Sequence, residues 1–201
     1  MSTSVTLTEP ATNITIGSAS VTSNYSGAQL SCSTSTDGEI TISASGGTGA
    51  IQYNIDGGSY QSSGVFTGLA AGTHTLIARD ANNCTATTTV TITAPSGVVI
   101  NSISKTLYNM ADLSCHNSSD GELTVSASGG TGALTYSLNG GSYGSSNIFS
   151  ALSAGTYTIS VKDANNCATS ATISINPPAA IVINSANKTL YNGSDRVVRV
   201  L

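Results

Sequence analysis

The sequence predicts an all-β chain built from tandem β-sandwich modules, and three observations support this fold class. Apolar residues alternate with Ser and Thr in many short segments, which is typical of strands that bury one face. Runs of Gly and Asn separate these segments at intervals of roughly 8 to 12 residues, the spacing of a sandwich. The whole pattern recurs 83 residues further along, so the chain holds two copies of one module.

The repeat keeps one length over most of a module. Residues 32–94 and 115–177 align without a gap and are identical at 34 of 63 positions, which is too many for chance. VVINSISKTLYN (98–109) returns as IVINSANKTLYN (181–192), the opening of a third copy, and SVTLTEP (4–10) resembles the closing TVTITAP (89–95). We therefore expect a window cut from a longer array. Its parts are a preceding tail or linker (1–12), two modules (13–96 and 97–179) and a truncated third repeat (180–201) whose last residues, SDRVVRVL, depart from the pattern.

Four segments of the second copy show the strand pattern most clearly. ELTVSAS (122–128) places Leu123, Val125 and Ala127 on one face, and ALTYSL (133–138), TYTISVK (156–162) and SATISIN (170–176) alternate in the same way. No segment keeps a period of 3.6 residues. We expect about seven strands per module in two packed sheets, which is an immunoglobulin-like sandwich.

The glycine-rich stretch SASGGTGA occurs twice, at 43–50 and 126–133. A phosphate-binding loop would require a following helix and usually a nearby lysine. Here a strand precedes the stretch, another strand follows, and no lysine is near. Its glycines are therefore predicted to turn the chain through positive φ between two strands.

Composition excludes two classes of partner. Only 8% of residues are charged and the net charge is −4, so the chain has no basic surface for nucleic acid. No run approaches the roughly 20 apolar residues of a membrane helix. We expect no nucleic-acid partner and no membrane span in this segment.

The four cysteines repeat with the module, as Cys32 and Cys84 in the first copy and Cys115 and Cys167 in the second. A metal site or a reactive thiol is the alternative interpretation, but CxxC spacing is absent. An even count in a small all-β module favours a disulfide inside each copy, Cys32–Cys84 and Cys115–Cys167. Closing a loop of that length would contribute about 4 kcal/mol and would imply an oxidising compartment, hence export.

Acidic and amide side chains form two matching groups. They are Asp37, Glu39, Asp80 and Asn82 in the first copy and Asp120, Glu122, Asp163 and Asn165 in the second. If the disulfide drew their loops together at one end of the module, these oxygens would suit Ca²⁺. The competing interpretation, which we favour, is turn chemistry, because DG signals a hairpin and DANN offers Asx turns. No cofactor is required, and Ca²⁺ is the one that such a group would accept.

No catalytic residue is predicted, and the chain is not expected to be an enzyme. His116 follows Cys115, but the first copy has Ser33 at this position, so no nucleophile and base recur with the repeat. His74 stands where the second copy has Tyr157, at a position similar to the tyrosine corner of Ig-like sandwiches. We expect His74 to be a structural replacement.

Tyr60 and Tyr143, in the repeated GGSY, are the best-placed exposed aromatic residues for stacking on a sugar. Packing at a sheet edge is the competing role for both side chains, and it is the one we favour. They are the candidate ligand-binding residues of the chain.

The ordered landmarks of the module resemble a known family. The first Cys, DGEI, GGTGA, LAAGTHT or LSAGTYT, and DANNC follow one another at fixed spacing, in a pattern similar to the SprB-type repeat of gliding-motility adhesins and giant surface proteins of Bacteroidetes-type bacteria. The resemblance implies an extracellular, cell-surface, outer-membrane-attached location, long tandem arrays, an adhesive or stalk role and no enzymatic activity. It supplies no ligand-binding residue.

Two functions follow as hypotheses. The first is a stalk or filament of serial sandwiches that holds an adhesive tip away from the cell, with neighbouring repeats as partners. The second is a repeat that recognises a glycan or a surface, with a calcium requirement if the acidic groups bind the ion. The segments 4–10 and 181–192 would also have unpaired strand edges, which predicts end-to-end association through terminal strands.

Overall fold

The computed structural model describes residues 13–185, which form twelve strands and no helix. Within this range, no helix is long and apolar enough to cross a membrane. The first module contains β1 (Thr15–Val21), β2 (Gly38–Ser45), β3 (Gln52–Ile55), β4 (Val65–Leu69), β5 (Gly72–Arg79) and β6 (Thr85–Ile92). The second contains β7 (Val99–Lys105), β8 (Gly121–Ser128), β9 (Thr135–Leu138), β10 (Ile148–Leu152), β11 (Gly155–Lys162) and β12 (Ala168–Ile175).

Each module is a sandwich of two three-stranded antiparallel sheets, which confirms the predicted all-β, immunoglobulin-like class. The sheets are β1-β2-β4 and β3-β5-β6 in the first module, and β7-β8-β10 and β9-β11-β12 in the second. Six strands form where about seven were expected. Residues 22–37 between β1 and β2 contain turns and an isolated bridge between Tyr25 and Ala28, and Tyr108 and Ala111 form the matching bridge in the second module.

The core of each module lies between its two sheets, because alternate residues of the strands point inward. In the first module Ile40, Ile42 and Phe66 from one sheet pack with Leu76 and Ile92 from the other. The second module repeats the cluster with Leu123, Val125, Ile159, Val161 and Ile175. The alternation read from the sequence is therefore the burial pattern of the folded strands.

The repeated glycine stretch is a turn that brings the ends of two strands together, as predicted. Gly47 has φ +69°, and a Cβ atom at this residue would lie 2.8 Å from the Cβ of Asp80. Gly130 stands in the same relation to Asp163, with φ +73° and a corresponding distance of 2.7 Å. Glycine is required here both for the left-handed backbone and for this close approach.

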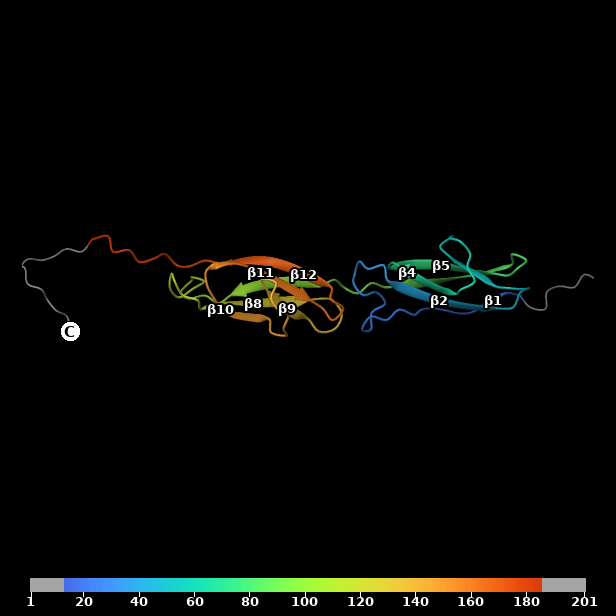
Figure 1. Cartoon of the computed structure of the whole chain (residues 1–201), viewed down its shortest axis with the longest axis horizontal. Helices are drawn as coiled ribbons and strands as arrows, with labels where there is room; N and C mark the ends of the chain where they lie inside the picture. The colour runs from blue at the N-terminus through green and yellow to red at the C-terminus, as the bar shows by residue number, and fades with distance from the viewer. Residues whose placement is uncertain (1–12, 186–201) are drawn as a thin grey trace, which may run out of the picture.

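The strands run along the long axis, and the two modules lie end to end (Figure 1). We define the C-terminal end of a module by its last strand residue and the turns that precede its second strand. In the first module this end holds residues 25–37. Gly38, the first residue of β2, lies beside Ile92, the last residue of β6: a Cβ at Gly38 would lie 2.8 Å from Ile92 and 3.0 Å from Leu30. The N-terminal end holds residues 46–49 and 80–84, where Gly47 meets Asp80.

Candidate functional site at the junction of the modules

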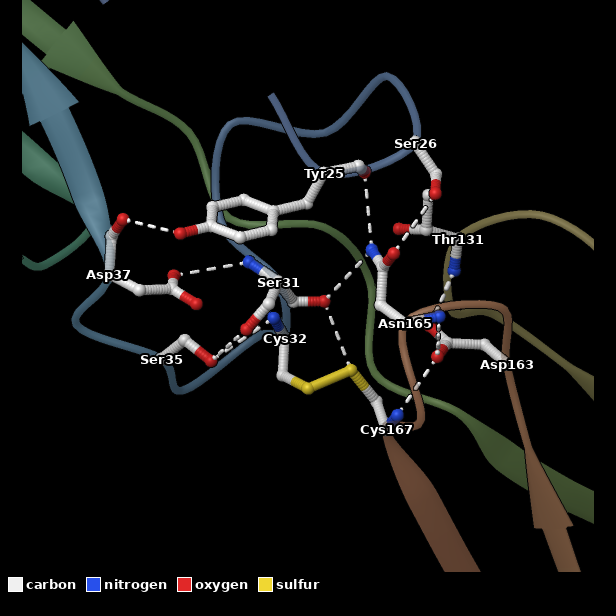
Figure 2. Close-up of a disulfide and its surroundings, with 10 residues drawn as sticks. All are labelled: Tyr25, Ser26, Ser31, Cys32, Ser35, Asp37, Thr131, Asp163, Asn165 and Cys167. Atoms are coloured by element: carbon white, nitrogen blue, oxygen red, sulfur yellow. Dashed lines mark hydrogen bonds between the residues drawn. A yellow bond between two sulfur atoms is a disulfide. The ribbon is translucent and has the colours of Figure 1, made fainter. Parts of the chain in front are cut away.

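A disulfide joins the two modules to each other. It links Cys32 at the C-terminal end of the first module to Cys167 at the N-terminal end of the second, with a Cα–Cα distance of 5.7 Å and a sequence separation of 135 (Figure 2). Cys84 and Cys115 are exposed and free.

The predicted pairs inside each module, Cys32–Cys84 and Cys115–Cys167, are wrong. Cys32 and Cys84 lie at opposite ends of the first module, separated by the length of β5 and β6. Strands of eight residues span about 26 Å, whereas disulfide-bonded Cα atoms lie roughly 4.4–6.8 Å apart. A bond within the module would therefore require the sandwich to come apart.

Beside the disulfide, the side chain of Asn165 reaches from the second module into the first. Its Nδ2 donates to the carbonyl oxygens of Tyr25, at 3.1 Å, and Ser31, at 3.2 Å, and its Oδ1 accepts from the hydroxyl of Ser26 at 3.0 Å. Figure 2 shows this amide between the two turns of the first module, next to the sulfur bridge. The junction is thus a polar contact around a covalent bond.

Hydrogen bonds within residues 25–37 of the first module fix the turns that present these acceptors. The Tyr25 hydroxyl donates to the backbone oxygen of Asp37 at 2.9 Å, and the Asp37 carboxylate accepts from the backbone N–H of Ser31 at 3.1 Å. Burial raises the pKa of Asp37, but the hydrogen bonds from Ser31 outweigh it and the pKa lies below its ordinary value. Cys32 is fixed in the same turn by a bond from its N–H to the hydroxyl of Ser35.

The second module orients Asn165 and Cys167 through one buried carboxylate. Asp163 is 3% exposed; its Oδ1 accepts from the backbone N–H groups of Asn165 and Cys167, both at 2.9 Å. Its Oδ2 accepts from Thr131 N–H in the glycine turn at 2.8 Å. This is the Asx-type turn that DANN predicts, and it aims both junction side chains at the neighbouring module.

Asp80 organises the matching loop of the first module. Its carboxylate accepts from the N–H groups of Thr48, Asn82 and Cys84, and these bonds, that from Thr48 above all, hold the pKa of Asp80 below its ordinary value. The two DANNC loops therefore have one conformation, although within the described range 13–185 only the second contacts another module.

The carboxylates proposed for calcium do not converge within a module. Asp37 and Asp80 lie at opposite ends of the first sandwich, as Asp120 and Asp163 do in the second. Glu39 and Glu122 instead accept hydrogen bonds from Thr22 and Thr106, respectively. Among residues 13–185 no group of three or more His, Cys, Asp or Glu side chains is placed to hold a metal. The four aspartates accept backbone N–H groups of the turns at their end of the module, which is the turn chemistry of the competing interpretation.

A second connection accompanies the disulfide at the junction. The backbone between β6 and β7 runs past the glycine turn of the second module, where Gly130 N–H donates to the Ser96 carbonyl at 2.9 Å. A Cβ on Gly97 would lie 3.3 Å from the Ser33 hydroxyl, so this linker also contacts the turn that carries Cys32. Linker and disulfide together tie the two ends at two separate points.

The tyrosines proposed for sugar stacking each have a cation over one ring face. The Arg79 guanidinium carbon lies 3.6 Å from the Tyr60 ring centre, and Lys162 Nζ lies 4.5 Å from that of Tyr143. Tyr143 is 39% exposed. A cation–π contact of this kind stabilises the loop locally, and it occupies one of the two faces that a sugar would use.

His74 takes the structural place of Tyr157, as expected. The Tyr157 hydroxyl donates to the Ser153 carbonyl at 2.8 Å, and His74 Nε2 makes the corresponding bond to Ala70 at 3.0 Å. His74 Nδ1 also lies 2.7 Å from Asp56. Burial would lower the pKa of His74, but the two acceptors raise it above its ordinary value, because both ring nitrogens face oxygens.

Sequence reasoning misses Tyr25, Ser26 and Ser31, which form the receiving half of the junction, and it singles out Asn165 only as a metal ligand. Repetition is the signal that could have found them, because Tyr25 and Ser31 recur as Tyr108 and Ser114 beside the first cysteine of each copy. A repeated spacing between a tyrosine and a cysteine does not by itself point to the next module.

The SprB repeat family model matches residues 24–59 and 107–142, one region in each module. No curated protein matches the chain. The SprB matches support a tandem extracellular repeat module.

The chain is also similar to several solved structures. The Clostridium thermocellum CbhA fibronectin(III)-like modules are 15% identical, with 86% of this chain and 100% of that chain covered and a TM-score of 0.34. The C-terminal 282-residue fragment of intimin, in complex with the intimin-binding domain of its translocated receptor, is 16% identical, with 82% and 64% covered and a TM-score of 0.35. Domains 4–9 of the surface layer protein SbsC are 13% identical, with 85% and 31% covered and a TM-score of 0.31.

Proposed function

We propose that this chain, in which two regions match the SprB repeat, is a tension-bearing spacer in the stalk of a bacterial cell-surface adhesin. The observation that carries the proposal is the disulfide between Cys32 and Cys167, because it joins consecutive modules instead of closing either one. A spacer must transmit force between its ends without lengthening. A covalent bond between neighbours serves that purpose directly.

The position of the bond determines the path of a pulling force. A force on the two termini passes along β1 to Cys32, across the disulfide to Cys167, and along β12 toward the C-terminus. Residues 33–166 form a closed loop that this path bypasses. Most of both sandwiches is therefore shielded from mechanical unfolding, and the loop removes roughly 450 Å from the length of the fully extended chain.

The double connection also restricts bending. A single linker of a few residues would let two sandwiches pivot about one point. The disulfide and the contacts of Asn165 hold the facing ends at a second point, beside the linker contact of Ser96 with Gly130. A stalk assembled from such junctions would keep an adhesive tip at a set distance from the cell.

The same bond supports an extracellular location, because structural disulfides persist in oxidising compartments. We propose no enzymatic role for this segment. The alternative, a glycan-binding repeat, receives no specific support, because cations already cover one face of Tyr60 and of Tyr143. Neighbouring repeats of the same array are the partners that the proposed function requires.

Single-molecule pulling on the whole chain, held at its two ends, tests the proposal. Under oxidising conditions we expect a maximum extension of roughly 230 Å, from the residues outside the closed loop, and roughly 700 Å after reduction. The variant Cys32→Ser should behave like the reduced protein in both conditions. Cys84→Ser is the matched control, because Cys84 is free, and it should keep the short extension of the oxidised chain.

Two results would overturn the proposal. One is full extension of the oxidised chain at low force. The other is peptide mapping that finds Cys32 bonded to Cys84 and Cys115 bonded to Cys167, since bonds within modules leave the junction unprotected.

A further inference from the structure

We propose that the two outer ends of this chain are mating surfaces for each other. The end that carries Cys115 would receive the loop that carries Cys84 from a second copy, and a disulfide would join them. The inference rests on the proposed function, because it extends the bonded junction from one pair of modules to a series. Its evidence is that each half of the observed junction occurs again at the opposite end of the molecule, where no other module contacts it within residues 13–185.

The receiving half is repeated at the C-terminal end of the second module. The Tyr108 hydroxyl donates to the Asp120 carbonyl oxygen at 2.9 Å, the distance found between Tyr25 and Asp37. Ser114 N–H donates to the Asp120 carboxylate at 3.3 Å, and Cys115 N–H to the Ser118 hydroxyl at 3.1 Å. These bonds match those of Ser31 and Cys32, so this end is formed before any partner arrives.

The inserting half of the junction is the loop that carries Asn165 and Cys167, and it is repeated at the N-terminal end of the first module. Asp80 Oδ1 accepts from the N–H groups of Asn82 and Cys84, each at 2.9 Å, and its Oδ2 accepts from Thr48 at 2.8 Å. The same three distances hold Asn165 and Cys167 around Asp163. Asn82 and Cys84 are thus presented as Asn165 and Cys167 are.

The residues at the observed junction are less exposed than the equivalent residues at the two outer ends. Asn165, Cys167, Ser31 and Cys32 are half-buried at the junction, whereas their counterparts are exposed at the two ends: Asn82, Cys84, Ser114 and Cys115. Folding of the module alone accounts for the shape of these loops. Only a neighbouring module accounts for the difference in exposure.

A hollow marks the place where the partner would sit. It lies between the turn 114–117 and residues 178–181, after the last strand of the second module. The corresponding segments of the first module are the turn that carries Cys32 and the linker after β6. There Gly130 contacts Ser96, and Asn165 contacts Ser31. The hollow therefore has the position, in the second module, of the surface that receives Asn165 in the first.

The two surfaces differ, so the contact is head-to-tail. A heterologous contact between the ends of an elongated molecule does not close on itself and generates a linear filament. Bond formation requires an oxidant, for which a small disulfide such as oxidised glutathione suffices. The thiolate of Cys84 attacks one sulfur of the oxidant and releases one thiol. The Cys115 thiolate then displaces the second, so two cysteines lose two electrons and one small disulfide becomes two thiols.

Two single variants of the whole chain test the inference. Cys84→Ser keeps only the Cys115 end, and Cys115→Ser keeps only the Cys84 end; both residues are exposed, so the modules should fold normally. Each variant is incubated in a glutathione redox buffer, alone and mixed one to one, and analysed by non-reducing electrophoresis with peptide mapping. We expect monomers from each variant alone, a dimer from the mixture, and a ladder from the unchanged chain.

A more specific readout uses the amide that enters the receiving turn. Asn82→Ala in the Cys115→Ser chain should lower the yield of mixed dimer several-fold, because it removes the counterpart of the Asn165 contacts. The inference would be overturned if each variant alone dimerised as well as the mixture. It would also be overturned if peptide mapping of the ladder found Cys84–Cys84, Cys115–Cys115 and Cys84–Cys115 bonds in random proportion. If Cys32–Cys167 still forms in those samples, the proposed function stands while the end-to-end contact fails.

Discussion

Cys32 and Cys167 are separated by 135 positions in the sequence, and their Cα atoms lie 5.7 Å apart. Each cysteine has a partner position 52 residues away in its own module, and neither bonds to it. The bond instead crosses the boundary between two copies of one repeat. Equivalent residues of a repeat therefore have different chemical states, bonded at the junction and free at the ends.

The Asn165 contacts are expected to set how readily the junction disulfide forms. Asn165→Ala removes hydrogen bonds to the carbonyls of Tyr25 and Ser31, which should cost about 1–2 kcal/mol of junction stability. The equilibrium of Cys32–Cys167 with glutathione should then shift toward reduction by roughly tenfold. Asn82→Ala at the equivalent exposed position is the control and should leave that equilibrium unchanged. An equal shift in both variants would contradict a specific role for the junction amide.

The pair formed by His74 and Asp56 should make the stability of the first module depend on pH. The folded-state pKa of His74 is raised, so its contribution is complete below the unfolded value of about 6.5 and is lost as pH rises through the folded value. The pKa of Asp56 is lowered, chiefly by the bond from His74. The contribution of Asp56 to the free energy of unfolding is therefore lost only as pH falls through its depressed folded-state pKa.

Urea unfolding at a series of pH values measures this effect. We expect the free energy of unfolding to fall between mildly acidic and alkaline pH. In His74→Tyr, which copies Tyr157 of the second module, this part of the slope should disappear. A variant with the same slope as the unchanged chain would show that His74 is not its source.

Asn54 is a candidate site for stabilisation. It is 5% exposed; its Nδ2 donates to the Gly58 carbonyl, and its Oδ1 has no partner. Ser137, the equivalent residue, makes the corresponding bond to Gly141 with a hydroxyl group at 2.7 Å. Asn54→Ser should therefore raise the free energy of unfolding by about 1 kcal/mol, because a buried unsatisfied acceptor is removed.

The reciprocal change, Ser137→Asn, controls for the difference in side-chain volume and should destabilise the second module. Chemical denaturation of both variants measures the two effects. Destabilisation by Asn54→Ser would mean that the lost packing outweighs the removed acceptor.

Calcium should leave the thermal stability unchanged. The acidic side chains are separated along each module, and Asp80 is occupied by three backbone N–H groups. We expect equal melting temperatures in excess Ca²⁺ and in chelator, measured by calorimetry. A saturable rise of the melting temperature with added calcium would refute this expectation and restore the calcium interpretation.

Much of the fold could be read from the sequence because it depends on local patterns. Alternation of apolar and polar residues predicted the strands, since a strand exposes successive side chains on opposite faces. The offset of 83 residues predicted two modules of one design, and the positive φ of the glycine turn followed from its residue types. Asp80 and Asp163 act in their turns, as the DANN pattern suggested. End-to-end association through strands 4–10 and 181–192 stays a prediction, since most of those residues lie outside the described part of the chain.

The cysteine pairing was decided only by the tertiary structure, for a reason that can be traced to residues 56–64. Between Cys32 and Cys84 the structure has four strands, β2 to β5, and four crossings alone would place both cysteines at the same end. The stretch after β3 turns back instead, and Gln61 forms an antiparallel bridge with Tyr53. This extra passage has no strand pattern in the sequence, yet it puts the two cysteines at opposite ends of the sandwich. The sequence alone determined which residues could form disulfides, and the direction of one irregular segment decided that the bond joins neighbours.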